Sequence, residues 1–285
     1  MSKKVAIVTD SIACLDKHMV SANGITIVPA TITSRGKSYR DWVDLTPTEA
    51  YELFLADPDN FGTSPAVPMD YVRTFIELGQ QGKDILCITI SSRISQMFNV
   101  ARIAGVQVSE EIPSASIEVF DSLTCTAAEG FIVLATAQAA AEGKSLPEVV
   151  KVAEELRGKV NFLVLLETIR HIYRSGRIPR IAAQVGALTN IKPILTMSSG
   201  KIGFAGAVRN KKRGMRQLLN RLRSRVGENP VHVAVMHAYA PAEADELMKM
   251  VSAEFNCAEL WLTEFSPVMG YVCGTGTVGF AFHRD

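Results

Sequence analysis

Apolar and polar positions along this chain alternate between patterns typical of strands and patterns typical of helices. Short apolar runs predict buried strands at 5–8, 25–32, 85–90, 117–120, 162–166, 191–195, 231–236 and 260–265. Longer periodic segments predict helices at 68–78, 95–111, 124–142, 211–226 and 241–255, with two short helices before residue 191. Residues 269–282 are expected to be sheet. Because strands and helices alternate along most of the chain, the sequence predicts an α/β fold.

Local signals place several boundaries. Capping boxes with proline in the first turn open helices at Thr46-Pro47-Thr48-Glu49 and Ser145-Leu146-Pro147-Glu148. Turns at 35–37 and 198–201 predict antiparallel hairpins. The pattern changes after Gly158, so we expect two domains, 1–158 and 159–285, with a ligand between them.

Composition excludes several classes of protein. The 285 residues include 30 Lys+Arg and 29 Asp+Glu, a balance that argues against disorder. No apolar run reaches the roughly 18 residues that a membrane-spanning helix needs, so no membrane span is expected. The five cysteines are scattered without a CxxC pair, which is typical of a reduced, cytoplasmic protein.

Charge is concentrated in one block. Residues 168–227 contain 14 Lys or Arg and no Asp or Glu. Such a block could bind nucleic acid. However, Tyr173 and Phe204 are its only aromatic residues, too few for a base-stacking surface, so nucleic acid is not the expected partner.

Motifs for cofactor or metal chemistry are weak or absent. Residues 274–279 fit G-x-G-x-x-G, but only six residues follow, too few for a dinucleotide-binding unit. We expect a glycine turn between two strands there. No catalytic residue, metal site or cofactor is predicted.

Hydroxyl-rich loops give a clearer indication of a ligand site. Residues 9–11, 63–64, 91–95 and 121–122 lie at or near predicted strand ends or helix starts. Ligands bind at the carboxyl ends of strands in open α/β sheets, and hydroxyls with helix-start N–H groups suit a carboxylate or phosphate. The alternative is that these hydroxyl groups serve only as ordinary caps of helices.

The order of these motifs resembles the DegV family of bacterial fatty-acid-binding proteins over nearly the whole chain. The matching segments are Val8-Thr9-Asp10-Ser11, Thr63-Ser64, Ser91-Ser92-Arg93-Ile94-Ser95, Asp121-Ser122, Ser175-Gly176-Arg177-Ile178, Asn190-Ile191-Lys192-Pro193-Ile194-Leu195, Gly200-Lys201-Ile202 and Met236-His237-Ala238. The resemblance implies a two-domain fold, with a mostly parallel N-terminal sheet and a mixed C-terminal sheet, each with helices.

The resemblance also implies a function. A long-chain fatty acid such as palmitate would lie in a buried tunnel, with Thr63 and Ser95 bound to its carboxylate and Gln96, Tyr271 and Gly274 nearby. A partner fatty acid kinase would phosphorylate the bound acid, so the protein itself would be a carrier and not an enzyme. The basic residues suited to that partner or to the phosphate are Arg174, Arg177, Lys201 and Arg209; a solvated basic face is the alternative.

Five positions depart from the family pattern. Val272 stands where the family usually has histidine, and Gln96-Met97 replaces Gly-Thr. Cys14 replaces aspartate, and Thr275 replaces the proline of a Gly-Pro-Gly turn. These changes bear on the ligand's head group and on coupling to a kinase more than on the fold. The fold's resemblance to dihydroxyacetone-kinase domains implies a second candidate function, an enzyme for a small phosphorylated ligand.

Overall fold

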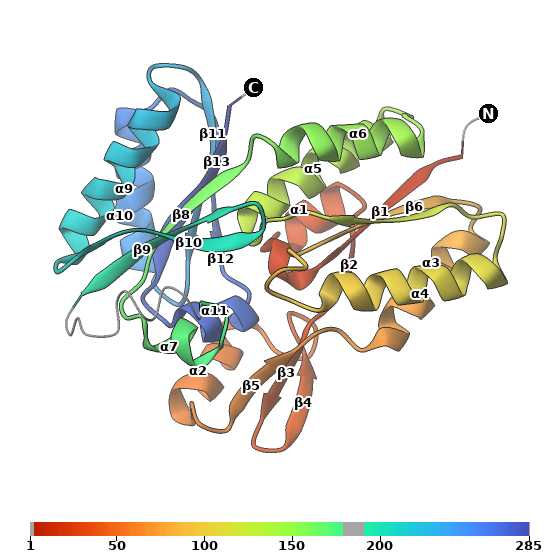
Figure 1. Cartoon of the computed structure of the whole chain (residues 1–285), viewed down its shortest axis with the longest axis horizontal. Helices are drawn as coiled ribbons and strands as arrows, with labels where there is room; N and C mark the ends of the chain where they lie inside the picture. Colours follow the sequence, from red (N-terminus) through yellow and green to blue (C-terminus); the bar gives the residue numbers. More distant parts are fainter. Residues whose placement is uncertain (1–2, 179–190, 285) are drawn as a thin grey trace.

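The computed structural model describes residues 3–178 and 191–284. Asn190 and the second short helix predicted before residue 191 lie outside these residues. The described strands form three sheets, and Figure 1 shows the parallel sheet and the larger mixed sheet side by side with the small sheet below them.

The first sheet is parallel throughout, in the order β2-β1-β6-β7. Its strands are β1 (Val5–Asp10), β2 (Thr26–Val28), β6 (Asp84–Thr89) and β7 (Ile117–Asp121). Figure 1 shows α3 (Pro68–Gln80) and α4 (Met97–Glu111) on one face, and α5 (Ala127–Ala141) and α6 (Leu146–Arg157) on the other. A parallel sheet covered on both faces needs strands that are apolar throughout, and β1 is buried at every position.

The second sheet is small and antiparallel, in the order β4-β3-β5. It comprises β3 (Thr31–Ser34), β4 (Lys37–Arg40) and β5 (Phe61–Ser64), and α2 (Pro47–Ala56) packs on it around Ile32, Phe54 and Phe61. The single strand predicted at 25–32 is therefore wrong: the chain breaks between β2 and β3 at Pro29, which has no N–H to donate. The strand β5 and the helix α1 (Lys17–Ala22) were not predicted.

The third sheet is mixed, in the order β10-β9-β8-β13-β11-β12, and only β11 and β12 are parallel. Its strands are β8 (Asn161–Leu165), β9 (Lys192–Ser198), β10 (Lys201–Val208), β11 (Val231–His237), β12 (Cys257–Glu264) and β13 (Val278–His283). The helices α9 (Lys211–Val226) and α10 (Pro241–Glu254) cover one face with a core of their own. The predicted parallel and mixed sheets are both confirmed.

Helix α5 joins the two large sheets. Its residues are buried on nearly all sides, and it packs against β1 and β6 of one sheet and β11 and β13 of the other. A helix that is apolar all round belongs in an interior, which explains why its sequence shows no amphipathic stripe. The main core is therefore continuous across Gly158, although β7 is the last strand of the parallel sheet and β8 the first of the mixed sheet along the chain.

The predicted sheet at 269–282 is wrong in its first half. Residues Pro267–Cys273 form α11, and β13 begins only at Val278. Ser266 caps the helix by accepting a hydrogen bond from the Val268 N–H at 3.2 Å, and Pro267 occupies the first turn. The glycine turn at 274–276 therefore connects a helix to a strand rather than two strands.

Candidate functional site

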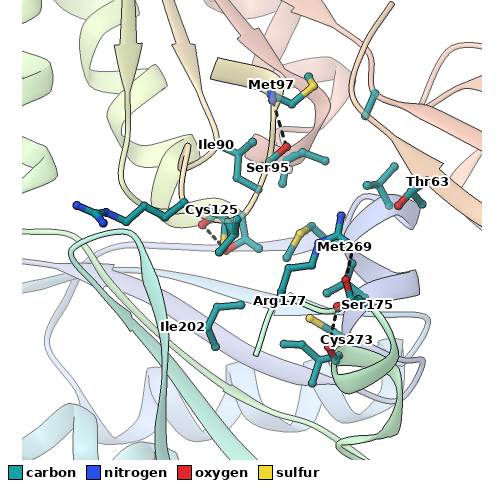
Figure 2. Close-up of a pocket in the computed structure, with 18 of the residues that line it drawn as sticks. Thr63, Ile90, Ser95, Met97, Cys125, Ser175, Arg177, Ile202, Met269 and Cys273 are labelled. Atoms are coloured by element: carbon teal, nitrogen blue, oxygen red, sulfur yellow. Dashed lines mark hydrogen bonds between the residues drawn. The ribbon is translucent and has the colours of Figure 1, made fainter. Parts of the chain in front are cut away.

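A cavity of about 630 Å³ lies where the three sheets meet. That volume falls within the range of roughly 300–1,000 Å³ typical of small-molecule sites. Its walls come from loops at the carboxyl ends of β1 and β6, from β5, from the β8–β10 part of the mixed sheet, and from α11 and the segment after α7 (Arg170–Arg174). Figure 2 shows labelled side chains from β5, the loop after β6, the start of α4, β10, α11 and the segment after α7 around one space.

Asp10 fixes two of the lining loops. One carboxylate oxygen accepts the Ile12 N–H and the other the Ile90 N–H, each at 2.9 Å. Both isoleucines line the cavity, so one side chain at the end of β1 sets the positions of two segments that are distant in sequence. Burial raises the pKa of Asp10 to about 7.

Hydroxyl groups lie on the side of the cavity formed by β5 and the start of α4. Ser95 Oγ accepts the Met97 N–H at 3.3 Å, which leaves its own O–H to donate. Ser95 was the predicted cap of this helix, but Gln96 is at the cap position and the helix begins at Met97, one residue later than a Ser95 cap would place it. The Ser95 hydroxyl still satisfies one of the free N–H groups of the helix. Thr63 is half-buried on β5, and its hydroxyl has no partner among the described residues. These two hydroxyls can donate to an anionic group.

The charged residues that line the cavity are all basic. Arg93, Arg177 and Lys201 belong to this set, and no acidic residue appears among the described lining residues. Arg177 donates to the Ser175 carbonyl at 2.6 Å, and none of the three cations forms an ion pair with a described residue. The electrostatic character therefore favours an anionic ligand over a cationic one.

The rest of the lining is largely apolar. Its residues include Phe162, Val164, Leu195, Ile202, Val268, Met269, Val272, Cys125 and Cys273. Met97 lines the same space, is almost fully buried, and accepts the Ala66 N–H on its sulfur at 3.0 Å. The arrangement can hold a molecule with a long apolar part and an anionic group. Val272 and Met97 are marked in the sequence as departures from the family pattern. The other apolar lining residues carry no such signal, because they resemble ordinary core residues.

Five of the nine predicted site residues line the cavity: Thr63, Ser95, Gln96, Arg177 and Lys201. The other four are not lining residues. The Tyr271 ring packs against Phe54 and Phe61 at 5.6 Å, and Gly274 lies against the His171 ring, which a Cβ would approach to 2.5 Å. Arg174 pairs with Asp59 at 2.9 Å, and Arg209 is exposed at the end of β10.

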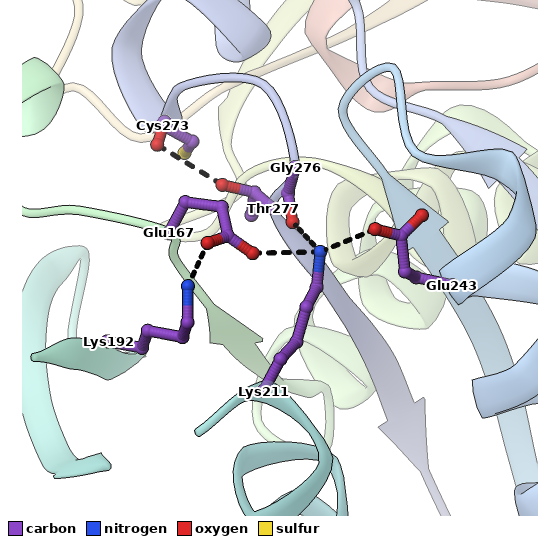
Figure 3. A network of polar contacts seen from close by, with 7 residues as sticks. All are labelled: Glu167, Lys192, Lys211, Glu243, Cys273, Gly276 and Thr277. Atoms are coloured by element: carbon purple, nitrogen blue, oxygen red, sulfur yellow. Dashed lines mark hydrogen bonds and ion pairs between the residues drawn. The ribbon is translucent and has the colours of Figure 1, made fainter. Parts of the chain in front are cut away.

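Five of the thirteen described Lys and Arg residues of the basic block pair with carboxylates from outside it. Lys211 Nζ lies 2.9 Å from carboxylate oxygens of both Glu167 and Glu243 and donates to the Gly276 carbonyl at 2.8 Å, as Figure 3 shows. Lys192 also pairs with Glu167. These contacts tie α9 and β9 to the glycine turn before β13. Part of the basic block therefore has a structural role in the mixed sheet.

Fold and cavity together define a class: an α/β protein of two large sheets with an amphipathic cavity between them. A model of the DegV family, described as uncharacterised protein, matches residues 4–285. The chain is 31% identical over 283 residues to a DegV domain-containing protein of Clostridium perfringens, covering 99% of each chain. This protein therefore belongs to the DegV family.

Solved structures agree in fold. A DegV family protein from Thermus thermophilus, described as fatty acid binding, matches with a TM-score of 0.90 and 26% identity over 99% of this chain and 100% of that one. A stearic-acid-binding protein from Eubacterium ventriosum matches with a TM-score of 0.91 and 26% identity over 100% and 98%. Within the described residues, no helix is long and apolar enough to cross a membrane.

Proposed function

We propose that this protein binds one long-chain fatty acid, such as palmitate, in the cavity. The observation that carries the proposal is the amphipathic lining of the cavity. Hydroxyl donors and basic side chains, with no acidic residue among the described lining residues, lie next to an extended apolar wall. Each CH₂ buried there contributes up to about 0.8 kcal/mol, less the cost of ordering the chain. The solved relatives described as fatty acid binding support the same ligand class.

Thr63 and Ser95 are the proposed carboxylate ligands, because their hydroxyls line the cavity with hydrogen atoms left to donate. Gln96 lies beside Ser95 at the surface, where its side chain accepts the Asn99 amide N–H at 2.7 Å. Tyr271 and Gly274 act from behind the wall, by packing α11 against α2 and α7. Val272 is buried on that wall, so the position where the family has histidine offers this ligand an apolar contact.

In this proposal the protein is a carrier in the cytoplasm and uses no cofactor. Its two domains are residues 1–158 and 159–285. It presents the carboxylate to a partner fatty acid kinase, where a carboxylate oxygen attacks the γ-phosphorus of ATP and ADP leaves. We assign Arg177 to the added charge, because it lines the cavity and forms no ion pair with a described residue. Lys201, which is exposed at the start of β10, is assigned to the partner surface. Arg174 and Arg209 lie outside the lining and are assigned to the partner surface.

Neither alternative gains support. Base stacking needs aromatic side chains, and the basic block contains only Tyr173 and Phe204, while Lys192, Lys211, Arg216 and Arg223 pair with acidic residues of this chain. An enzyme for a small phosphorylated ligand does not account for the long apolar wall.

Palmitate affinity tests the carboxylate assignment. Thr63→Ala combined with Ser95→Ala removes two hydrogen bonds to a charged group, each worth about 1.5–3 kcal/mol, so the dissociation constant should rise at least a hundredfold. The exposed Thr48→Ala, on α2, is the matched control and should bind as the wild type does. Unchanged affinity in the double variant would remove Thr63 and Ser95 from the site.

Conversion of bound palmitate to acyl phosphate by a fatty acid kinase with ATP tests the partner surface. Arg209→Glu should slow this conversion and leave palmitate affinity unchanged, because Arg209 does not line the cavity. Equal conversion rates in the two proteins would contradict the assignment.

A further inference from the structure

The hairpin formed by β9 and β10 reaches from the mixed sheet to the loops of the parallel sheet. At its tip, the Gly200 carbonyl accepts a hydrogen bond from Ser91 Oγ at 3.0 Å. Ser91 is fully buried at the end of β6, and its own N–H donates to the Thr124 carbonyl at 2.9 Å. The tip of a surface hairpin is thus docked on a rigid part of the other sheet.

Glycine is required at this tip for two reasons. Gly200 has a φ of +77°, a conformation that side chains rarely adopt. A Cβ on Gly200 would also lie 2.6 Å from Ser91 Oγ and 3.0 Å from the Arg93 side chain. The close approach therefore depends on the missing side chain.

The docked tip brings the next residues of β10 into the cavity wall. Lys201 and Ile202 both line the cavity, and Ile202 is half-buried. Figure 2 shows Ile202 and Thr63 on opposite sides of the space, with Arg177 between them. A carboxylate held at Thr63 would therefore direct its hydrocarbon chain toward Ile202.

We propose that Ile202, held in place by the Ser91–Gly200 contact, closes the end of the cavity opposite Thr63 and limits the length of acyl chain that binds. This inference rests on the proposed fatty-acid function. It assigns a specificity-determining role to Ile202 and a positioning role to Ser91 and Gly200.

The dissociation constants of saturated acids from C12 to C20 test the proposal. Ile202→Ala removes three carbons from the end wall, so the preferred chain should lengthen, with about a fourfold gain in relative affinity for each methylene newly accommodated. Ile202→Phe should shift the preference to shorter chains. Ser91→Ala should broaden the preference, because the hairpin tip loses its hydrogen bond.

Ile103→Ala, the same truncation at an exposed position of α4, is the matched control and should keep the wild-type profile. Thermal melting verifies folding, and Ile202→Val provides a milder change at the wall. If the wild type binds fatty acids but the Ile202 variants keep its preference for chain length, the inference is overturned. A carboxylate held near Lys201 instead of Thr63 would also overturn it. If the wild type binds no fatty acid, the proposed function itself fails.

Discussion

Asp41 provides a test of the buried electrostatics behind the cavity. The residue follows β4, is completely buried, and accepts a hydrogen bond from Ser266 Oγ at 2.5 Å. Its second carboxylate oxygen has no hydrogen-bond partner among the described residues. Burial raises the pKa of Asp41 to about 7 from an ordinary value of 3.8. Ser266 in turn caps α11, so Asp41 supports a wall of the site.

The raised pKa fixes the sign of the pH effect. The folded protein holds the Asp41 proton more tightly than the unfolded chain, so its contribution to stability is full below pH 3.8 and is lost as pH rises toward 7. Three pKa units correspond to about 4 kcal/mol, of which about 2.5 kcal/mol is lost between pH 5 and pH 8. Asparagine cannot ionise, and its carbonyl can still accept the Ser266 hydrogen bond.

Asp41→Asn should therefore gain stability relative to the wild type as pH rises. Urea unfolding at pH 5 and pH 8 measures the free energy of unfolding of both proteins, and their difference should change by about 2.5 kcal/mol in favour of the variant. The exposed Asp245→Asn, on α10, should show no such change. Parallel pH profiles for Asp41→Asn and the wild type would refute the buried-charge argument.

Two substitutions test packing and ion pairing elsewhere. Gly270→Ala should lower the free energy of unfolding by about 1–3 kcal/mol or more, because the new Cβ would lie 2.2 Å from the buried Tyr51 ring. Gly158→Ala has room for the added Cβ and should leave urea unfolding unchanged. A fully stable Gly270→Ala would contradict this packing. Lys211→Met should lower the melting temperature, because it leaves Glu243 without its cation and removes one of the two cations paired with Glu167. The exposed Lys212→Met should not lower it. Equal melting temperatures for the two lysine variants would show that the network contributes no stability.

The sequence predicted the parts of the fold whose signals are local. Both capping boxes, the hairpins and the apolar strands of the two large sheets are present as expected. The failures involve competition between signals. Apolar residues at 269–273 suggested sheet, although Ser266-Pro267 was a readable helix start. The strand β5 is short, contains Gly62, and forms only by pairing with β3, which a local pattern cannot reveal.

The site was predictable only where polar residues marked it. Thr63, Ser95, Gln96, Arg177 and Lys201 line the cavity, whereas most of the wall of apolar and sulfur-containing residues had no sequence signature. The ion pairs of the basic block could not be predicted, for a physical reason. Its acidic partners, such as Glu167 and Glu254, lie outside residues 168–227, and only the fold brings them together.

Mass spectrometry of the solvent extract from the purified protein, with native mass spectrometry alongside, tests the central claim most directly. We expect one C14–C18 fatty acid per chain in the wild type, lost in the Thr63→Ala, Ser95→Ala double variant and retained in Thr48→Ala. A protein that contains no fatty acid and takes up none when it is added would contradict the proposed function.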